Sequence, residues 1–260
     1  MAVKRSKAIV IGHYPLSEAD RIVIFLTRDY GKIRAVAKGA RKIKSRLCGR
    51  LEILTYGDLL YYERTGKDLH NVNSFDIIEP FQILREDLLK MAYCSYIAEL
   101  IQHVVSEEET DPETFDLMLN VMVIMVESND PEIIVRAFEI RLLERMGLSP
   151  KLNSCIICSG EISDPNPKFS IQAGGVLCKK CSDSGYHGIS ISRGSLEMMK
   201  KMQETGIDLI PRLKASNSSK QEISKLLSSF IAFHMDVKNL HSVSFLESIK
   251  SEYRGQDSDQ

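Results

Sequence analysis

Two C-x-x-C pairs in the pattern C-x₂-C-x₁₉-C-x₂-C contain four of the six cysteines: Cys155, Cys158, Cys178 and Cys181. Two residues between thiolates let one tight turn present both sulfurs to a metal ion, and two such turns complete a tetrahedron. Gly160 helps the chain curl around the first pair, and Gly174-Gly175 predicts a hairpin tip that returns the second pair. Because four sulfurs leave no position for water, we predict one structural Zn²⁺ per chain.

Other chemistry for these cysteines remains open at this point. The alternatives to a metal site are four unrelated reduced thiols, two disulfides or a redox C-x-x-C pair. Disulfides need an oxidising compartment. A redox role does not explain why two pairs occur at this spacing. Of the remaining cysteines, Cys94 is expected in a helix core and Cys48 has no predicted role.

The second pattern is AKGARKIKSRLCGR, residues 37–50, with six cations and no acid. From residue 31 to 51 there are eight cations and still no acid: Lys32, Arg34, Lys38, Arg41, Lys42, Lys44, Arg46 and Arg50. Such a run is a solvated face, a targeting label or a surface that neutralises phosphates without reading sequence. On the last interpretation Gly39 and Gly49 let the backbone bend around a strand. Neutralising about five phosphates predicts a log–log salt slope of about −3.5 to −4.5.

No residue set predicts catalysis. The six histidines are scattered, and the chain has no phosphate-binding loop, G-x-S-x-G elbow or H-E-x-x-H motif. The carboxylate clusters Glu107–Glu109 and Glu18/Asp20 are best interpreted as solvated turns. We therefore expect a protein that is not an enzyme.

The charge distribution separates the chain into two parts. The net charge is −1 over 260 residues, yet residues 1–80 hold 15 Lys and Arg against 9 Asp and Glu. That imbalance indicates a polyanion-binding part joined to a neutral or acidic part. No apolar run reaches the length of a membrane span, and the N-terminus lacks the apolar core of a signal peptide. We expect a cytoplasmic protein without a membrane partner.

Five short segments rich in Val, Ile, Tyr and Phe predict strands in residues 1–80. Gly31 and Gly66 lie in turns between these segments, where a hairpin needs a residue with positive φ. Five strands without a covering helix predict a small closed barrel, with an SH3-like barrel as the rival. Tyrosines of the same segment offer stacking platforms for bases: Tyr14, Tyr30, Tyr56, Tyr61 and Tyr62.

Helical spacing begins after Pro80 and predicts helices over 82–105, from 112 to about 127, and from 131 to 146. It returns at 195–203 and at 221–237, where Ser218 or Ser219 is the capping candidate. The fold class is therefore α+β with several domains. The predicted parts are a barrel (1–80), a helical domain in two segments (81–150 and 189–250), a cysteine insert (151–188) and a disordered tail (251–260).

A longer pattern places these elements in a known context. Residues 18–41 follow E-x-D-R-I-V-x-x-x-T-R-x-Y-G-K-I-R-x-V-A-K-G-A-R, and residues 44–51 follow K-S-R-L-x-G-R-L. FEIRLLERMG at 138–147 and a C-x-x-C with GGVLC-x-x-C at 155–181 come later. In this order, as far as Cys181, the chain resembles the family of the bacterial DNA repair and recombination mediator RecO. From residue 191 onward the match is only in helical character.

This resemblance implies an N-terminal OB-fold, a central helical domain and an inserted zinc-finger module. It also implies binding of single- and double-stranded DNA and annealing of complementary strands. RecO-like proteins work with RecR and the single-stranded DNA-binding protein to load RecA, which implies a nucleoid-associated role. Family members do not all keep the cysteines, so zinc is not expected to be essential to DNA binding. The rival function is a zinc-containing protein–protein adaptor that does not bind DNA directly, and a nuclease or helicase ranks third.

Overall fold

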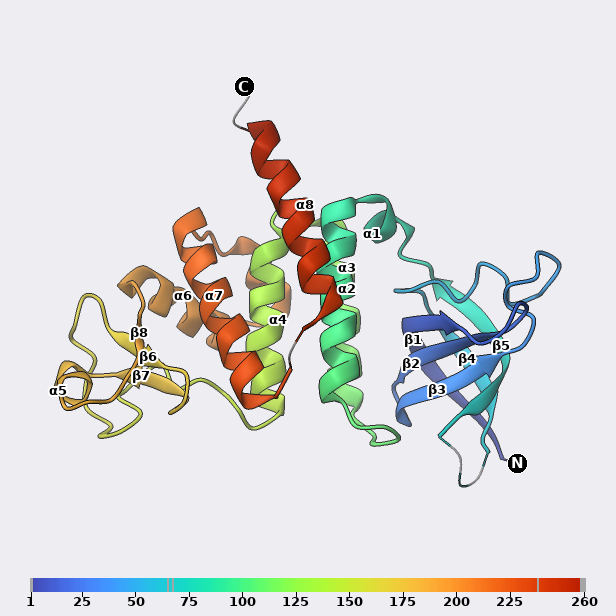
Figure 1. Cartoon of the computed structure of the whole chain (residues 1–260), viewed down its shortest axis with the longest axis horizontal. Helices are drawn as coiled ribbons and strands as arrows, with labels where there is room; N and C mark the ends of the chain where they lie inside the picture. The colour runs from blue at the N-terminus through green and yellow to red at the C-terminus, as the bar shows by residue number, and fades with distance from the viewer. Residues whose placement is uncertain (1, 65, 67, 238, 258–260) are drawn as a thin grey trace. The chain divides into compact units, whose positions relative to one another are not determined.

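The structure, a computed structural model, describes residues 2–64, 66, 68–237 and 239–257, with only the backbone from residue 252 onward. The chain divides into two compact units, Met1–Val126 with Asn239–Gln260, and Glu127–Lys238. The predicted helical domain is therefore shared between both units. Figure 1 labels the elements of each unit.

Five strands form a closed barrel in the first unit: β1 (Val3–Pro15), β2 (Arg21–Thr27), β3 (Gly31–Ala37), β4 (Tyr56–Tyr62) and β5 (His70–Glu79). The order around the barrel is β1-β2-β3-β5-β4, and β1 closes it by pairing with both β2 and β4. β3 and β5 run parallel, whereas the other pairs are antiparallel. This is an OB-type five-stranded barrel, so the connectivity excludes the SH3-like alternative. Gly31 and Gly66 have the predicted positive φ, 66° and 71°.

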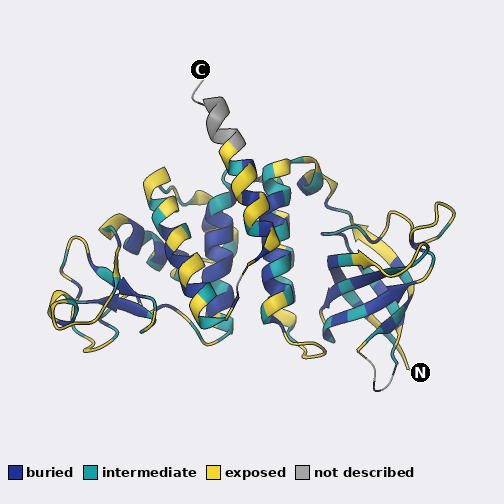
Figure 2. Ribbon diagram, viewed as in Figure 1, coloured by how far each residue is buried: buried dark blue, intermediate teal, exposed yellow. Residues whose placement is uncertain are grey.

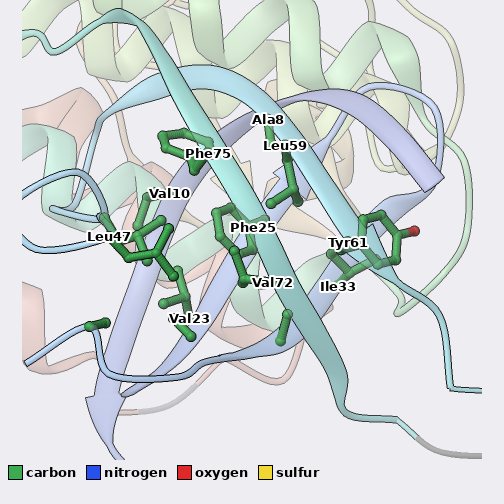
Figure 3. Close-up of a cluster of buried hydrophobic side chains, with 14 residues drawn as sticks. Ala8, Val10, Val23, Phe25, Ile33, Leu47, Leu59, Tyr61, Val72 and Phe75 are labelled. Atoms are coloured by element: carbon green, nitrogen blue, oxygen red, sulfur yellow. The ribbon is translucent and has the colours of Figure 1, made fainter. Parts of the chain in front are cut away.

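Alternating strand residues fill the inside of the barrel (Figure 3). The rings of Phe25 and Phe75 lie 5.7 Å apart between their centroids, in a tilted arrangement. Three further core residues, Ala40, Leu47 and Leu51, come from the segment between β3 and β4 rather than from a strand. Figure 3 shows Leu47 among the side chains of this core cluster. The loop that carries most of the predicted cations thus contributes apolar side chains to the barrel core.

Four helices complete the first unit: α1 (Gln82–Glu86), α2 (Leu88–Val104), α3 (Pro112–Glu127) and α8 (His241–Asp257). The single helix predicted over 82–105 is two helices, because Asp87 is extended and its carboxylate accepts the N–H of Lys90 to begin α2. The carboxylate of Glu99 on α2 accepts the first N–H groups of α8, from His241 and Ser242. The pKa of Glu99 is lowered because these hydrogen bonds outweigh the opposing effect of burial.

α8 continues as far as Asp257, so residues 251–257 are helical where the sequence predicted a disordered tail. The reason is that a helix already begun at His241 extends at little cost, one hydrogen bond for each added residue. Residues 258–260 lie outside the described residues.

The second unit contains α4 (Pro131–Arg145), α6 (Arg193–Glu204), the 3₁₀ turn η1 (Ile207–Arg212) and α7 (Asn217–His234). The cap of α7 is Ser216, whose side chain accepts the N–H of Ser219, rather than Ser218 or Ser219 as predicted. Within α4 the guanidinium of Arg136 is 2.8 Å from both carboxylate oxygens of Glu139, and both side chains are buried.

Residues 151–190, which we call the cysteine module, lie between α4 and α6. The module holds a three-stranded sheet and a short helix: β6 (Lys168–Ser170), β7 (Gly175–Leu177), β8 (Ile189–Ser190) and α5 (Lys179–Asp183). The pairing of β8 with β6 extends the module two residues beyond the predicted boundary at 188. Phe169 is fully buried and its ring packs edge-on against Phe230 of α7, which fixes the module to the helices of this unit.

No helix in the described ranges is both long and apolar enough to cross a membrane.

Candidate nucleic-acid interface and metal centre

The basic loop, residues 38–50, follows β3 and is a chain of tight turns. Successive backbone hydrogen bonds run from Lys42 N–H to the Gly39 carbonyl and from Ser45 N–H to the Lys42 carbonyl, both 2.9 Å. Gly39 and Gly49 take positive φ, 69° and 71°, as these turns require. The buried Ala40 and Leu47 fasten both halves of the loop to the barrel core. The turns between them are therefore held in place although their side chains face solvent.

Most of the predicted phosphate-binding cations lie on this loop, where the surface is exposed (Figure 2). Within the described residues, four of them have no hydrogen bond or ion pair to their side chains: Lys38, Lys42, Lys44 and Arg46. The guanidinium of Arg41 is exposed and donates to the Ser17 carbonyl at 2.6 Å. Unpaired cations on an anchored loop form a surface that attracts a polyanion.

The turn between β1 and β2 supports the basic loop. The carboxylate of Asp20 accepts the N–H of Gly39 at 2.8 Å, and the carbonyl of Ala19 accepts the N–H of Arg41 at 3.1 Å. In OB-folds the β1–β2 loop and the face of strands 2 and 3 are common oligonucleotide sites. Asp20 is thus a positioning residue rather than the solvated carboxylate that the sequence indicated.

The remaining predicted cations are engaged by the chain itself. Lys32 donates to the Gln102 carbonyl, and desolvation lowers the pKa of its ammonium group. The guanidinium of Arg34 is 3.0 Å from the Glu107 carboxylate; burial opposes its charge, but Glu107 raises its pKa nonetheless. Arg50 lies 3.5 Å from the Asp76 carboxylate. The structure therefore does not place Lys32 and Arg34 with the unpaired cations.

Glu107 belongs to the acidic loop, residues 106–110, which lies against the first half of β3. The Glu108 N–H donates to the Lys32 carbonyl at 3.0 Å, and the Glu108 carboxylate is 3.1 Å from the His70 ring. A side chain at Gly31 would collide with the backbone carbonyl of Glu109. This segment is consequently packed against the barrel edge and is not simply a solvated turn.

The predicted stacking platforms are only partly available. Tyr61 is buried, and its pKa is raised, first by burial. Tyr30 packs against the barrel core, and the Tyr56 ring lies 6.2 Å from that of Phe115. Tyr14 and Tyr62 remain exposed.

Exposed apolar side chains beside the cations were missed by sequence reasoning. Ile43 is 93% exposed between Lys42 and Lys44, and Leu16 on the β1–β2 turn is 48% exposed. Hydropathy alone places both inside, so only the structure identifies them.

Three cations of α4 are also engaged by the chain itself. Arg136 is buried with Glu139, and Arg141 donates to the Glu144 carboxylate and the Thr205 carbonyl. Arg145 is also engaged. These side chains serve the helices of the second unit.

The four cysteines converge in the cysteine module, as their spacing predicted. All four Sγ atoms lie within 4.8 Å of one another, and those of Cys158 and Cys178 are 3.6 Å apart. Zn–S bonds of about 2.3 Å place tetrahedral sulfurs about 3.8 Å apart, so the cluster has the right size for this ion. All four are free thiols and none forms a disulfide.

Each cysteine pair is presented by a tight turn. In the first turn the Cys155 N–H donates to the Gly160 carbonyl, and a side chain at Gly160 would lie 3.2 Å from the Cys158 sulfur. The second pair comes from the end of β7 and the first turn of α5. Gly174 has the positive φ of the predicted hairpin tip, 87°.

Electrostatics within the cluster favour a cation. Burial disfavours the Cys155 thiolate, but N–H groups of Cys178, Cys158 and Ile157 hydrogen-bond to its sulfur and lower its pKa to about 6. Burial and the neighbouring cysteines raise the pKa of Cys181 to about 12. Four thiolates at this spacing repel one another without a counter-ion, and a bound cation removes that repulsion. The residues present therefore fit a four-thiolate metal ion.

An OB-type barrel with an unpaired cationic loop, joined to helices that carry a cysteine module, defines a class of multi-domain proteins built around an oligonucleotide-binding fold. Residues 1–81 match the family model described as Recombination protein O N terminal, and residues 85–243 match Recombination protein O C terminal. The chain therefore belongs to the RecO family of DNA repair proteins, as its sequence motifs indicated.

Curated relatives extend over nearly the whole chain. The DNA repair protein RecO of Symbiobacterium thermophilum is 33% identical over 254 residues, covering 96% of this chain and 99% of that protein. The protein of the same name from Alkaliphilus metalliredigens is 30% identical over 246 residues, covering 94% and 99%. That of Clostridium novyi is 31% identical over 256 residues, covering 97% of each.

Proposed function

We propose that this chain is a non-enzymatic recombination mediator that binds single- and double-stranded DNA through the basic loop and anneals complementary strands. The observation that carries the proposal is the set of four cations without a partner in the described chain, Lys38, Lys42, Lys44 and Arg46, on an anchored loop of an OB-type barrel. Arg41 adds a fifth cation whose exposed guanidinium is already oriented by Ser17.

Phosphate binding by these side chains is independent of sequence, because they offer charge rather than a fixed pattern directed at base edges. Lys32 and Arg34 are left out of the primary contacts because the acidic loop and α2 engage them. Four to five phosphate contacts give a log–log salt slope of about −2.8 to −3.5 for single strands and about −3.6 to −4.5 for duplexes.

Annealing needs no catalytic residue in this mechanism. Two strands repel each other through their phosphates, and a cationic surface that holds both lowers that repulsion and raises their encounter rate. Base pairing then supplies the free energy of the reaction. The protein leaves the duplex when competing cations replace its lysines and arginines on the phosphates.

The metal that we propose for the cysteine cluster is Zn²⁺, one per chain and structural. Four Sγ atoms within 4.8 Å of one another can fill all four positions of a tetrahedral site and leave none for water, so the ion would tie the two turns together rather than polarise a substrate. Cys155, Cys158, Cys178 and Cys181 would hold it as thiolates.

Partners are proposed from family membership. RecR and the single-stranded DNA-binding protein would act with this chain to load RecA onto coated DNA, at the nucleoid in the cytoplasm. The relatives are DNA repair proteins, which supports the repair context. The alternative function is an adaptor that does not bind DNA directly.

The test is equilibrium binding of a fluorescein-labelled oligonucleotide, measured by anisotropy at several salt concentrations, with wild type and the triple variant K42A/K44A/R46A. We expect the variant to lose at least about tenfold in affinity at low salt, and its slope to become shallower by about 2 for single strands. Its thermal unfolding should match wild type, because exposed charges contribute little to stability. Equal affinity and slope in both proteins would contradict the proposed surface.

A further inference from the structure

Burial in the core does not explain why the basic loop has an isoleucine at residue 43. Its side chain is 93% exposed, the highest value among the exposed large apolar residues of the described chain. Leu47, four residues later, is buried in the barrel core and holds the loop in place. Two apolar residues of similar size in one loop therefore have opposite roles, and Ile43 contributes no buried area to the fold.

The backbone at Ile43 is nevertheless held in place. The hydrogen bond from Ser45 N–H to the Lys42 carbonyl closes the turn that contains Ile43, and Ala40 and Leu47 enter the core on either side. The side chains of Lys42 and Lys44, its direct neighbours, are exposed and unpaired within the described residues. Ile43 thus lies between two unpaired cations of the basic loop.

The chemistry of a single strand matches this arrangement. Phosphates lie on one side of each sugar and an unpaired base on the other, so a strand whose phosphates meet Lys42 and Lys44 can lay a base against an apolar side chain between them. In a duplex the base faces are stacked inside and only edges are open in the grooves. Leu16 is exposed on the turn that hydrogen-bonds to this loop, and offers a second apolar side chain on that turn.

Resting on the proposed function, we propose that Ile43 is a base-contacting residue that makes the basic loop favour strands with unpaired bases over duplexes. The ligand is the face of a nucleobase in single-stranded DNA, held there by the flanking cations. Ile43 contributes to affinity through apolar contact, and Lys42 and Lys44 contribute through charge. The two contributions therefore separate experimentally, because charge contacts change the salt slope and an apolar contact does not.

The experiment compares wild type, I43A and I83A by anisotropy across a salt series. Ile83 is a matched control because it is the same residue type, is 55% exposed, and belongs to α1 rather than to the basic loop. Three probes are used: an oligothymidine, a strand of the same length in which a run of central sites is abasic, and a duplex of that length. The abasic strand keeps every phosphate and removes the bases.

We expect I43A to bind oligothymidine about fivefold more weakly at every salt concentration, with an unchanged slope. Its affinity for the abasic strand and the duplex should equal that of wild type, and I83A should match wild type on all probes. An equal loss on the abasic strand would overturn the inference, because the contact would then be to the backbone. Unchanged binding of I43A to oligothymidine would also overturn the inference. The exposed Ile43 would then be a candidate contact for a protein partner instead.

These failures are distinguishable from failure of the proposed function. If K42A/K44A/R46A weakens binding and I43A does not, only the base contact is wrong. If wild type binds none of the probes, both proposals are wrong.

Discussion

The basic loop and the cysteine module are both turn-rich segments, yet they present their functional side chains in opposite ways. The loop directs Lys42 and Lys44 into solvent, whereas the module brings four sulfurs to within 4.8 Å of one another. The loop is anchored by apolar residues, with Leu47 in the barrel core. The module is anchored at Phe169, and its turns meet at the thiol cluster.

The difference follows from where the opposite charge comes from. Side chains of like charge that await a large external polyanion have to stay apart and hydrated, so an apolar core must hold their backbone. Thiolates that share one small cation have to converge, so the cation itself holds their backbone. The effect of a substitution should therefore be largest when it removes the anchor of the module, and smaller when it removes the anchor of the loop. It should be smallest when only one surface charge changes.

The largest effect is expected from C155S in the cysteine module. Structural zinc contributes about 10–16 kcal/mol of apparent binding free energy in small finger peptides, so losing one ligand should release the metal and unfold the module. Metal analysis should fall from one equivalent to well below one, and limited proteolysis should cut within residues 151–190. C48S is the control: Cys48 is exposed and outside the cluster, so that variant should retain one equivalent. Full metal content in C155S would contradict a four-thiolate site.

A middle-sized effect is expected from L47A, which removes the anchor of the basic loop. Truncating a buried leucine at the edge of a core lowers the free energy of unfolding by about 2 kcal/mol. DNA affinity should fall as well, because the cations lose their fixed positions. Urea unfolding followed by circular dichroism measures the first effect and anisotropy the second. I43A should leave the free energy of unfolding unchanged; an equal loss in both variants would contradict the distinction between anchor and contact residue.

The smallest effect is expected from E107Q, which removes the carboxylate that neutralises Arg34. The freed guanidinium adds one phosphate contact, so the salt slope for single strands should steepen by about 0.7 and low-salt affinity should rise about two- to threefold. Stability should fall by less than about 1 kcal/mol, as is usual for half-exposed ion pairs. E161Q changes the net charge equally at an exposed position of the cysteine module, and is the control for a general charge effect. Equal slopes in both variants would show that Arg34 does not reach DNA.

Much of the fold was predictable because its signals are local. Strand composition and the glycines at 31 and 66 predicted five strands with the right turns, and the thiol spacing predicted the cluster. The barrel type was not predictable from composition, because the parallel contact between β3 and β5 joins residues that are distant in sequence, such as Ala35 and His70. The helix boundary at Asp87 was missed because periodicity continues across it.

By itself, the sequence determined which residues could do chemistry: a quartet of thiols at a metal spacing, and a stretch of cations without an acid. Only the tertiary structure decided which of these cations are available. Arg34 is engaged by Glu107, 73 residues later, whereas Lys42 and Lys44 have no partner in the described chain. It also decided that Leu47 is buried in the barrel core and that Ile43 is exposed. The physical reason is that charge neutralisation and burial depend on neighbours in space, which chain connectivity does not specify.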